Sequence, residues 1–204
     1  MGVTDAASQP FYIEDADPPS KREILKAALQ LFVRNGLCET TIRAIAVEAG
    51  YTNPALFKFF DGKDDLALHL FERCYARLSA DVAGAVVPER PFRENLRALI
   101  TTFAVGLDEH PEAFLYVHEH LRRFWPHVRP ALRRRSIVGI SKALFQQGAR
   151  EGAVTAEISA DLLAHAFIGV LAQFGRASYF GEFPGAARAW VPKLERMVCR
   201  MTKP

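Results

Sequence analysis

The stretch AGYTNPALFKFF, residues 49–60, decides how the N-terminal part of the chain folds. Gly50 is a residue type that ends helices, and Thr52 or Asn53 can cap a new helix directly after it. Pro54 then falls in the first turn, where the backbone N–H groups have no helical partner and a proline is tolerated. The stretch therefore predicts the end of one helix, a tight turn and the start of another.

The aromatic residues of this stretch divide between two directions. At about 100° per residue, Leu56, Phe59 and Phe60 lie on one face of the predicted helix, whereas Phe57 and Lys58 point elsewhere. We expect the first three to anchor the helix in its own domain and Phe57 to be available to a partner.

Two further helices are predicted before this stretch. Ser20 and Glu23 have the spacing of a capping box, and apolar residues at helical spacing follow as far as about Asn35. A second helix begins near Thr41, whose hydroxyl can cap it, and ends at Gly50. Two short helices joined by a glycine-containing turn are a candidate helix-turn-helix.

The rest of the chain also reads as helix, and we find no convincing strand. The predicted helices are 63–84, 92–109, 111–125, 130–151, 159–180 and 185–202. Proline and glycine separate them, as in VVPERP and GEFPG. The fold class is therefore all-α.

Composition bounds the alternatives without choosing among them. The 204 residues are 50% hydrophobic and 24% charged, with a formal net charge of +3, which allows a polyanionic partner but does not require one. Three separated cysteines without a Cys-x-x-Cys pair suggest neither a disulfide framework nor a zinc site. We expect no cofactor and no bound metal.

The N-terminus is acidic and contains three prolines in residues 1–19, so we expect a disordered tail there. It lacks the basic, apolar character of a signal peptide, and no apolar run approaches the length of a membrane span. A cytoplasmic protein is expected.

Residues 22–66, REILKAALQLFVRNGLCETTIRAIAVEAGYTNPALFKFFDGKDDL, resemble the DNA-binding domain of the TetR (tetracycline repressor) family. That family has an R-x-x-I-L-x-A-A-x-x-L-F-x-x-x-G opening, then T-T-x-x-x-I-A-x-x-A-G, then L-[YF]-x-x-F-x-x-K-x-x-L. The resemblance implies a helix-turn-helix DNA-binding domain at 20–66 and a ligand-sensing, dimerising helical bundle at 67–204.

The resemblance also implies which residues meet DNA. Arg43, Asn53, Pro54 and Phe57 would face bases, and the remaining contacts would go to the backbone. The full expected set is Thr41, Arg43, Thr52, Asn53, Pro54, Phe57, Lys58 and Lys63. Arginine can bind guanine with two hydrogen bonds, asparagine can pair with adenine, and an apolar ring can lie against a thymine methyl group.

A small, largely apolar effector is expected in the second domain. Helix 92–109 aligns apolar residues on one face, and His118 falls in the apolar stripe of the next helix, either as a core histidine or as a polar anchor of a ligand pocket. The expected ligand-binding residues are Phe103, Leu107, Phe114, His118, Leu121 and Phe167.

The same histidine invites a metalloenzyme hypothesis, with His118, Glu119 and His120 as the reactive groups. Residues two apart point to different sides of a helix, and the His-Glu-x-x-His pattern is absent, so we expect no enzyme. Six arginines between Arg122 and Arg135 allow three interpretations: a solvated helix face, a site for an anionic ligand group, or a supplementary DNA contact.

Helix 159–180 is apolar on most of its circumference, so it must be covered on both sides. We expect its stripe of small residues and the last helix to form a homodimer interface. The expected interface residues are Ile168, Ala172, Gly175, Trp190, Leu194 and Met197. The predicted function is a sequence-specific transcriptional regulator, expected to be a repressor that an apolar ligand releases from its operator. The alternative is an architectural DNA-binding protein without an effector.

Overall fold

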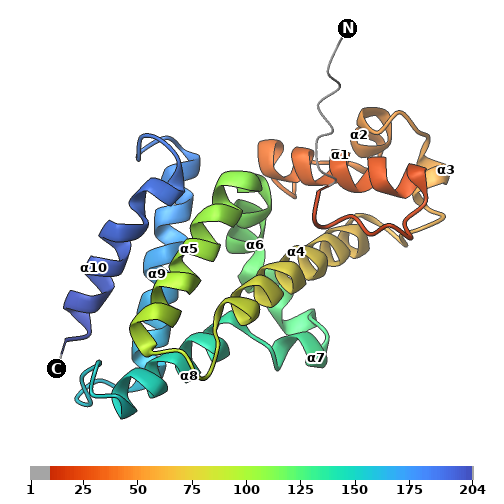
Figure 1. Cartoon of the computed structure of the whole chain (residues 1–204). Helices are drawn as coiled ribbons and strands as arrows, with labels where there is room; N and C mark the ends of the chain where they lie inside the picture. Colours follow the sequence, from red (N-terminus) through yellow and green to blue (C-terminus); the bar gives the residue numbers. More distant parts are fainter. Residues whose placement is uncertain (1–9, 204) are drawn as a thin grey trace, which may run out of the picture. The chain divides into compact units, whose positions relative to one another are not determined.

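The computed structural model describes residues 10–203, and every regular element in that range is a helix (Figure 1). The elements are α1 (Pro19–Asn35), α2 (Ile42–Glu48), α3 (Asn53–Leu56), α4 (Lys63–Ala85), α5 (Phe92–Glu109), α6 (Pro111–Phe124), η1 (Trp125–His127), α7 (Pro130–Arg133), α8 (Ile137–Arg150), α9 (Ala160–Tyr179), η2 (Ala187–Trp190) and α10 (Val191–Met201). The predicted all-α fold is confirmed for the described residues.

The chain forms two compact units, residues 1–74 and residues 75–204. The boundary falls within α4, between Cys74 and Tyr75, so this helix contributes residues to both units.

In the first unit, α1, α2 and α3 pack against one another around a small apolar core. The core side chains include Ile24, Leu25, Phe32, Ile45, Leu56, Phe60, Leu66 and Leu70, all of them buried. The members of this core that belong to α1 and α4 recur at helical spacing, which is why the sequence alone located both helices.

The turn between α2 and α3 is held by backbone hydrogen bonds of the Schellman type. The N–H of Tyr51 donates to the Ala46 carbonyl at 2.8 Å, and the N–H of Gly50 donates to the Val47 carbonyl at 3.0 Å. Gly50 has a φ of 73°, a conformation that a residue with a Cβ rarely adopts. The glycine therefore fixes where α2 ends and how α3 leaves it.

The segment before α1 differs from the expected disordered tail. Residues 1–9 lie outside the described residues, but Tyr12 and Ile13 are buried. The Asp17 carboxylate is buried as well, and it pairs with Lys21 at 3.0 Å and with the guanidinium of Arg73 on α4. The prediction of disorder was therefore wrong for residues 10–19, because a partner 56 residues away holds the segment.

The expected capping box at Ser20 was also wrong. Helix α1 begins at Pro19, and its N-cap residue, Pro18, has no side chain that could accept a hydrogen bond. Ser20 lies inside the first turn instead, where a preceding proline has already set the helical geometry.

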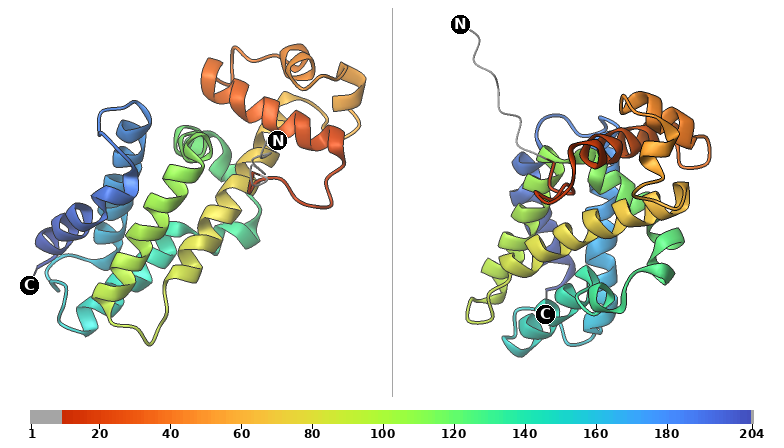
Figure 2. Two further views of the ribbon diagram at one scale, coloured as in Figure 1. Left: turned by 45° about the horizontal axis from the view of Figure 1, so that its top comes forward. Right: turned by 90° about the vertical axis from the view of Figure 1, so that its right-hand side faces the viewer.

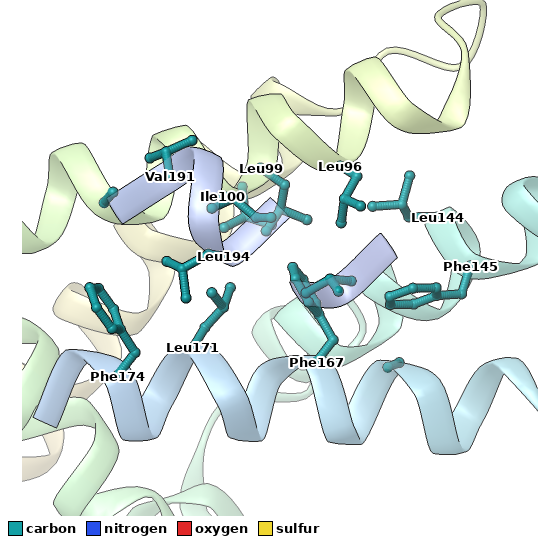
Figure 3. Packing of buried hydrophobic residues seen from close by; sticks show 14 of the residues in the cluster. Leu96, Leu99, Ile100, Leu144, Phe145, Phe167, Leu171, Phe174, Val191 and Leu194 are labelled. Carbon is teal, nitrogen blue, oxygen red and sulfur yellow. The ribbon is translucent and has the colours of Figure 1, made fainter. Parts of the chain in front are cut away.

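The second unit is a helical bundle with a continuous apolar core, in which α10 packs on α5 and α8 packs on α9 (Figure 2). Figure 3 shows side chains from α5, α8, α9 and α10 meeting in this core. The labelled residues are Leu96, Leu99, Ile100, Leu144, Phe145, Phe167, Leu171, Phe174, Val191 and Leu194.

Two of the predicted helices are interrupted. Residues 130–151 form α7 and α8 in place of one helix, because the Ser136 hydroxyl accepts a hydrogen bond from the Gly139 N–H and so caps a new helix. Residues 185–202 likewise begin with the 3-10 turn η2, and α10 starts where Pro192 occupies its first turn.

Candidate functional site

Helices α2 and α3 each have one buried face and one exposed face. Ile45, Leu56 and Phe60 are buried in the core of the first unit. Seven of the eight residues expected to contact DNA are exposed: Thr41, Arg43, Thr52, Asn53, Pro54, Phe57 and Lys58. The structure thus brings these seven onto the solvent-facing side of the helix-turn-helix.

Phe57 is the most conspicuous member of this surface. Helix α3 ends at Leu56, and Phe57 is its C-cap residue. The Phe57 N–H donates a hydrogen bond to the Asn53 carbonyl at 3.1 Å. Its side chain is 53% exposed, whereas that of Phe60 is 3% exposed. A phenylalanine held outward by a hydrogen-bonded backbone is ready to contact a partner without rearrangement of the helix.

Two threonines lie at the helix starts on this surface. The Thr41 hydroxyl accepts a hydrogen bond from the Ala44 N–H at 3.1 Å and caps α2. Thr52 is the N-cap residue of α3, but its side chain makes no capping hydrogen bond. Both hydroxyls keep a proton that can be donated to an anionic oxygen.

Lys63 is half-buried, unlike the seven exposed residues, and its expected phosphate contact stays a prediction. Its ammonium donates to the carbonyls of Leu37 at 2.8 Å, Cys38 at 3.2 Å and Thr40 at 2.8 Å. A lysine has three donors, and all three are used by the backbone between α1 and α2. Lys63 therefore fastens this loop to the start of α4.

Two further exposed residues accompany this surface and were not predicted from the sequence. Val47 is 71% exposed, and Tyr51 is 37% exposed in the turn before α3. Val47 follows Arg43 by four residues, so both lie on one side of α2. That spacing was a usable signal, since a large apolar residue on the exposed face of a short helix is a candidate contact.

The second unit contains a cavity of about 710 Å³. Helices α4, α5, α6, α8 and α9 all contribute to its wall, and most of the lining side chains are apolar, among them Leu78, Leu99, Phe103, Phe114, Val117, Leu121, Val138, Ile168 and Leu171. This volume lies within the range of pockets that hold drug-sized ligands, about 300 to 1,000 Å³.

The cavity opens to solvent along the C-terminal half of α6. His118, Leu121, Arg122 and Pro126 line the cavity and are also exposed. His118 is therefore an exposed residue at the mouth and not a core histidine. Arg122 places a positive charge at the same opening.

Four of the six residues expected to bind a ligand line this cavity: Phe103, Phe114, His118 and Leu121. The Phe103 and Phe114 rings meet edge to face, with centroids 5.2 Å apart. Leu107 and Phe167 are not among the lining residues, because both are buried in the core cluster, where the Phe167 and Phe145 ring centroids are 5.6 Å apart. Their contact with a ligand stays a prediction.

Five of the six expected dimer-interface residues are partly or fully buried within their own chain, and their role in an interface stays a prediction. Ile168, Ala172 and Gly175 line the cavity, and Leu194 belongs to the core. Trp190 is half-buried, and its indole N–H donates to the Pro184 carbonyl at 3.2 Å. Met197 alone of the six is exposed.

The exposed side of α9 carries other residues, namely Leu162, Ala166, Gly169 and Gln173. These residues are spaced four, three and four positions apart in the sequence, so they form a single stripe along α9. Because α9 is apolar on most of its circumference, periodicity could not tell which stripe faces outward.

The three side chains of the metalloenzyme hypothesis, His118, Glu119 and His120, do not form a cluster. His118 and Glu119 are exposed, whereas His120 packs between the rings of Tyr116 at 4.8 Å and Phe124 at 5.9 Å. Burial lowers the pKa of His120, with a smaller contribution from Arg123. Within residues 10–203, no group of three or more His, Cys, Asp or Glu side chains is arranged to hold a metal ion.

These features define an all-helical protein with a helix-turn-helix unit followed by a bundle that encloses an apolar cavity. Residues 24–70 match the model of the bacterial regulatory proteins of the tetR family. The match spans most of α1, all of α2 and α3, and the first turns of α4.

Curated relatives match part of the chain. The HTH-type transcriptional regulator BetI of Brucella anthropi is 30% identical over 84 residues, which are 41% of this chain and 43% of BetI. The HTH-type transcriptional repressor KstR2 of Rhodococcus jostii is 30% identical over 100 residues, 48% of this chain and 49% of KstR2. The chain thus spans less than half the length of these relatives.

Solved structures extend the likeness in fold to both units. The ketosteroid transcriptional regulator KstR2 of Mycobacterium tuberculosis has a TM-score of 0.78 at 19% identity, covering 93% of this chain and 97% of that one. The fatty acid degradation regulator FadR from Bacillus halodurans has a TM-score of 0.75 at 16% identity, covering 91% and 97%. None of the helices in the described range is long and apolar enough to span a membrane.

Proposed function

We propose that the protein is a DNA-binding transcriptional regulator whose affinity for its operator is lowered by an apolar small molecule. The observation that carries this proposal is the division of α2 and α3 into a buried face and an exposed face with Arg43, Asn53, Phe57 and Lys58. These side chains combine two base readers, an apolar ring and a positive charge. BetI and KstR2, two relatives of this chain, are named as transcriptional regulators.

The charge of the first unit supports selective binding more than strong unspecific binding. Residues 21–65 contain seven basic and six acidic side chains, a net charge of +1 (7 − 6). Lys63 is used by the backbone, and Lys26 pairs with Glu23 at 2.9 Å. Affinity must therefore come from the placement of Arg43 and Lys58 and not from the number of charges.

The cavity supports regulation by an apolar ligand. Its wall includes Tyr75, Leu78 and Val82 of α4, and the same helix begins with Lys63, which holds the loop before α2. A ligand that favours one position of α4 would thereby bias the placement of α2 and α3, since both sites use a single helix. Names of two structural neighbours, which mention ketosteroids and fatty acids, agree with an apolar ligand.

A homodimer is part of the proposal. Leu162 on α9 and Met197 and Met201 on α10 are large apolar side chains that are exposed in the single chain. A second copy can bury them in a two-fold interface, and two copies would present two helix-turn-helix surfaces to a pseudo-palindromic site.

One experiment tests the regulatory step. Apolar compounds that raise the melting temperature of the protein are added to its complex with a duplex selected from random DNA. We expect such compounds to weaken the complex by about 5- to 150-fold. Compounds that stabilise the protein but leave DNA affinity unchanged would support an effector-independent architectural protein instead.

A further inference from the structure

Six arginines begin with Arg122 in the cavity wall and are not used by the function proposed above. They lie in residues 122–136, which we call the arginine segment: Arg122, Arg123, Arg129, Arg133, Arg134 and Arg135. No aspartate or glutamate occurs between Glu119 and Glu151, so nothing within the sequence from 120 to 150 offsets this charge. All six arginines are exposed.

Both ends of the arginine segment are fixed at the cavity wall. Arg122, Trp125 and Pro126 line the cavity where the segment begins, and Ser136 lines it where the segment ends. The segment therefore leaves the cavity wall after Pro126 and returns to it directly after Arg133, Arg134 and Arg135.

Tyr75 of α4 contacts residues at both ends of the arginine segment. Its ring packs edge to face on Trp125, with centroids 5.0 Å apart, and its hydroxyl accepts a hydrogen bond from the Ile137 N–H at 3.0 Å. The Ser79 hydroxyl donates to the Arg135 carbonyl, which fixes the same end a second time. Backbone anchoring of this kind limits the entropy lost when the arginines bind a ligand.

Four of the six guanidinium groups are available for such binding. Of the residues that the structure describes, none forms an ion pair with Arg122, Arg133, Arg134 or Arg135. A guanidinium binds phosphate oxygens with two parallel hydrogen bonds, which makes a cluster of free arginines suited to a multiply charged phosphate group.

The geometry points to an amphipathic ligand whose apolar part fills the cavity and whose phosphate-bearing head binds the arginine segment. This inference rests on the proposed function for the cavity and specifies the chemical class of its ligand. The cavity wall supplies the apolar contact, and Arg122, which belongs to both the wall and the segment, marks where the head emerges.

Three probes test the inference by isothermal titration calorimetry: dodecanol, dodecyl phosphate and inorganic phosphate. For the unmodified chain we expect dodecyl phosphate to bind at least about ten-fold more tightly than dodecanol, since charge-assisted hydrogen bonds add to the same apolar contact. Inorganic phosphate alone should bind much more weakly than either, because it lacks the apolar part.

The double variant Arg133→Gln/Arg134→Gln should bring the ratio of dodecyl phosphate affinity to dodecanol affinity close to one. Its affinity for dodecanol should not change. The control Arg93→Gln/Arg150→Gln removes the same charge from exposed arginines that do not line the cavity, and it should keep the preference. Arg133→Lys/Arg134→Lys should keep part of it, because charge remains but the paired donors are lost. Equal melting temperatures of all variants would confirm that folding is intact.

Each contrary result has its own meaning. If dodecanol and dodecyl phosphate bind equally, or if the double variant keeps the preference, the arginine segment is not the head site, while the apolar cavity stands. If neither compound binds, the cavity assignment and this inference both fail. Loss of DNA affinity in the double variant, with the phosphate preference intact, would overturn the inference in favour of a supplementary DNA contact.

Discussion

Phe57 and Phe60 lie three residues apart directly after α3, yet Phe57 is 53% exposed and Phe60 is 3% exposed. The Phe60 ring contacts Phe59 and His69, with centroid distances of 6.4 Å and 5.3 Å. One phenylalanine therefore contributes to the core, and the other is free to contribute to binding.

Alanine substitutions should separate these two roles. Phe60→Ala should lower the free energy of unfolding by about 3–5 kcal/mol, as large core truncations do. Phe57→Ala should leave the melting temperature almost unchanged and weaken specific DNA binding, most at a step containing thymine. Calorimetric melting and fluorescence anisotropy measure the two effects. A Phe57→Ala protein that melts several degrees lower yet binds normally would show that Phe57 is a structural residue.

Lys63 and Lys58 form a second matched pair. Lys63→Ala should destabilise the first unit by about 1–3 kcal/mol, because three backbone carbonyls lose a charged donor. Lys58→Ala should instead leave stability unchanged and lower the slope of log affinity against log salt by about one, as the loss of one phosphate contact does. If Lys63→Ala changes only the salt slope, Lys63 contacts DNA after all.

The pH dependence of stability has an identifiable source in His69. Burial, together with the positive charges of Arg73 and Lys21, lowers the pKa of His69 from 6.5 to about 4. Between these two values the unfolded chain binds a proton at this site and the folded chain does not. Stability should therefore fall as the pH is lowered from about 6.5 toward 4.

The variant His69→Phe should make this decline shallower, because the ring keeps its contact with Phe60 but no longer ionises. It also removes Nε2, a buried nitrogen without a hydrogen-bond partner in the described structure. His127→Phe, at an exposed position, is the control and should leave the pH profile unchanged. Urea unfolding at pH 5 and pH 7.5 measures the stability of the unmodified protein and of the two variants. If stability falls by the same amount in all three proteins, His69 is not the source of the decline.

The proposed dimer interface can be tested at Gly169. A Cβ at this position would meet no atom of its own chain within 4 Å, so Gly169→Arg should be tolerated by the monomer. In a closely packed two-fold interface the same charge would lack a partner, and we expect the mass measured by light scattering to halve. Gln146→Arg on the exposed side of α8 is the control. A Gly169→Arg protein that keeps the dimer mass would remove this side of α9 from the interface.

The sequence predicted most reliably what depends on local spacing. Apolar residues at helical intervals located α1 and α2, and Gly50 located the turn between α2 and α3. The exposure of Phe57 followed from the same periodicity, although α3 is shorter than expected.

What the sequence could not predict depends on residues far apart in the chain. Lys63 binds carbonyls 23 to 26 residues earlier, and Asp17 meets an arginine 56 residues later. No local pattern reports such pairs. The outward side of α9 was likewise undetermined, because a helix that is apolar all round gives no direction to its hydrophobic pattern.

The central claim is that the exposed surface of α2 and α3 reads a DNA sequence, and selection of bound duplexes from random DNA tests it most directly. The account predicts enrichment of a pseudo-palindrome, with half-sites about one helical turn apart or somewhat more. The variant Arg43→Ala should lose preference at one base pair per half-site, at a cost of about 1–3 kcal/mol. Failure of the unmodified protein to enrich any sequence, or an identical motif with and without Arg43, would contradict the account.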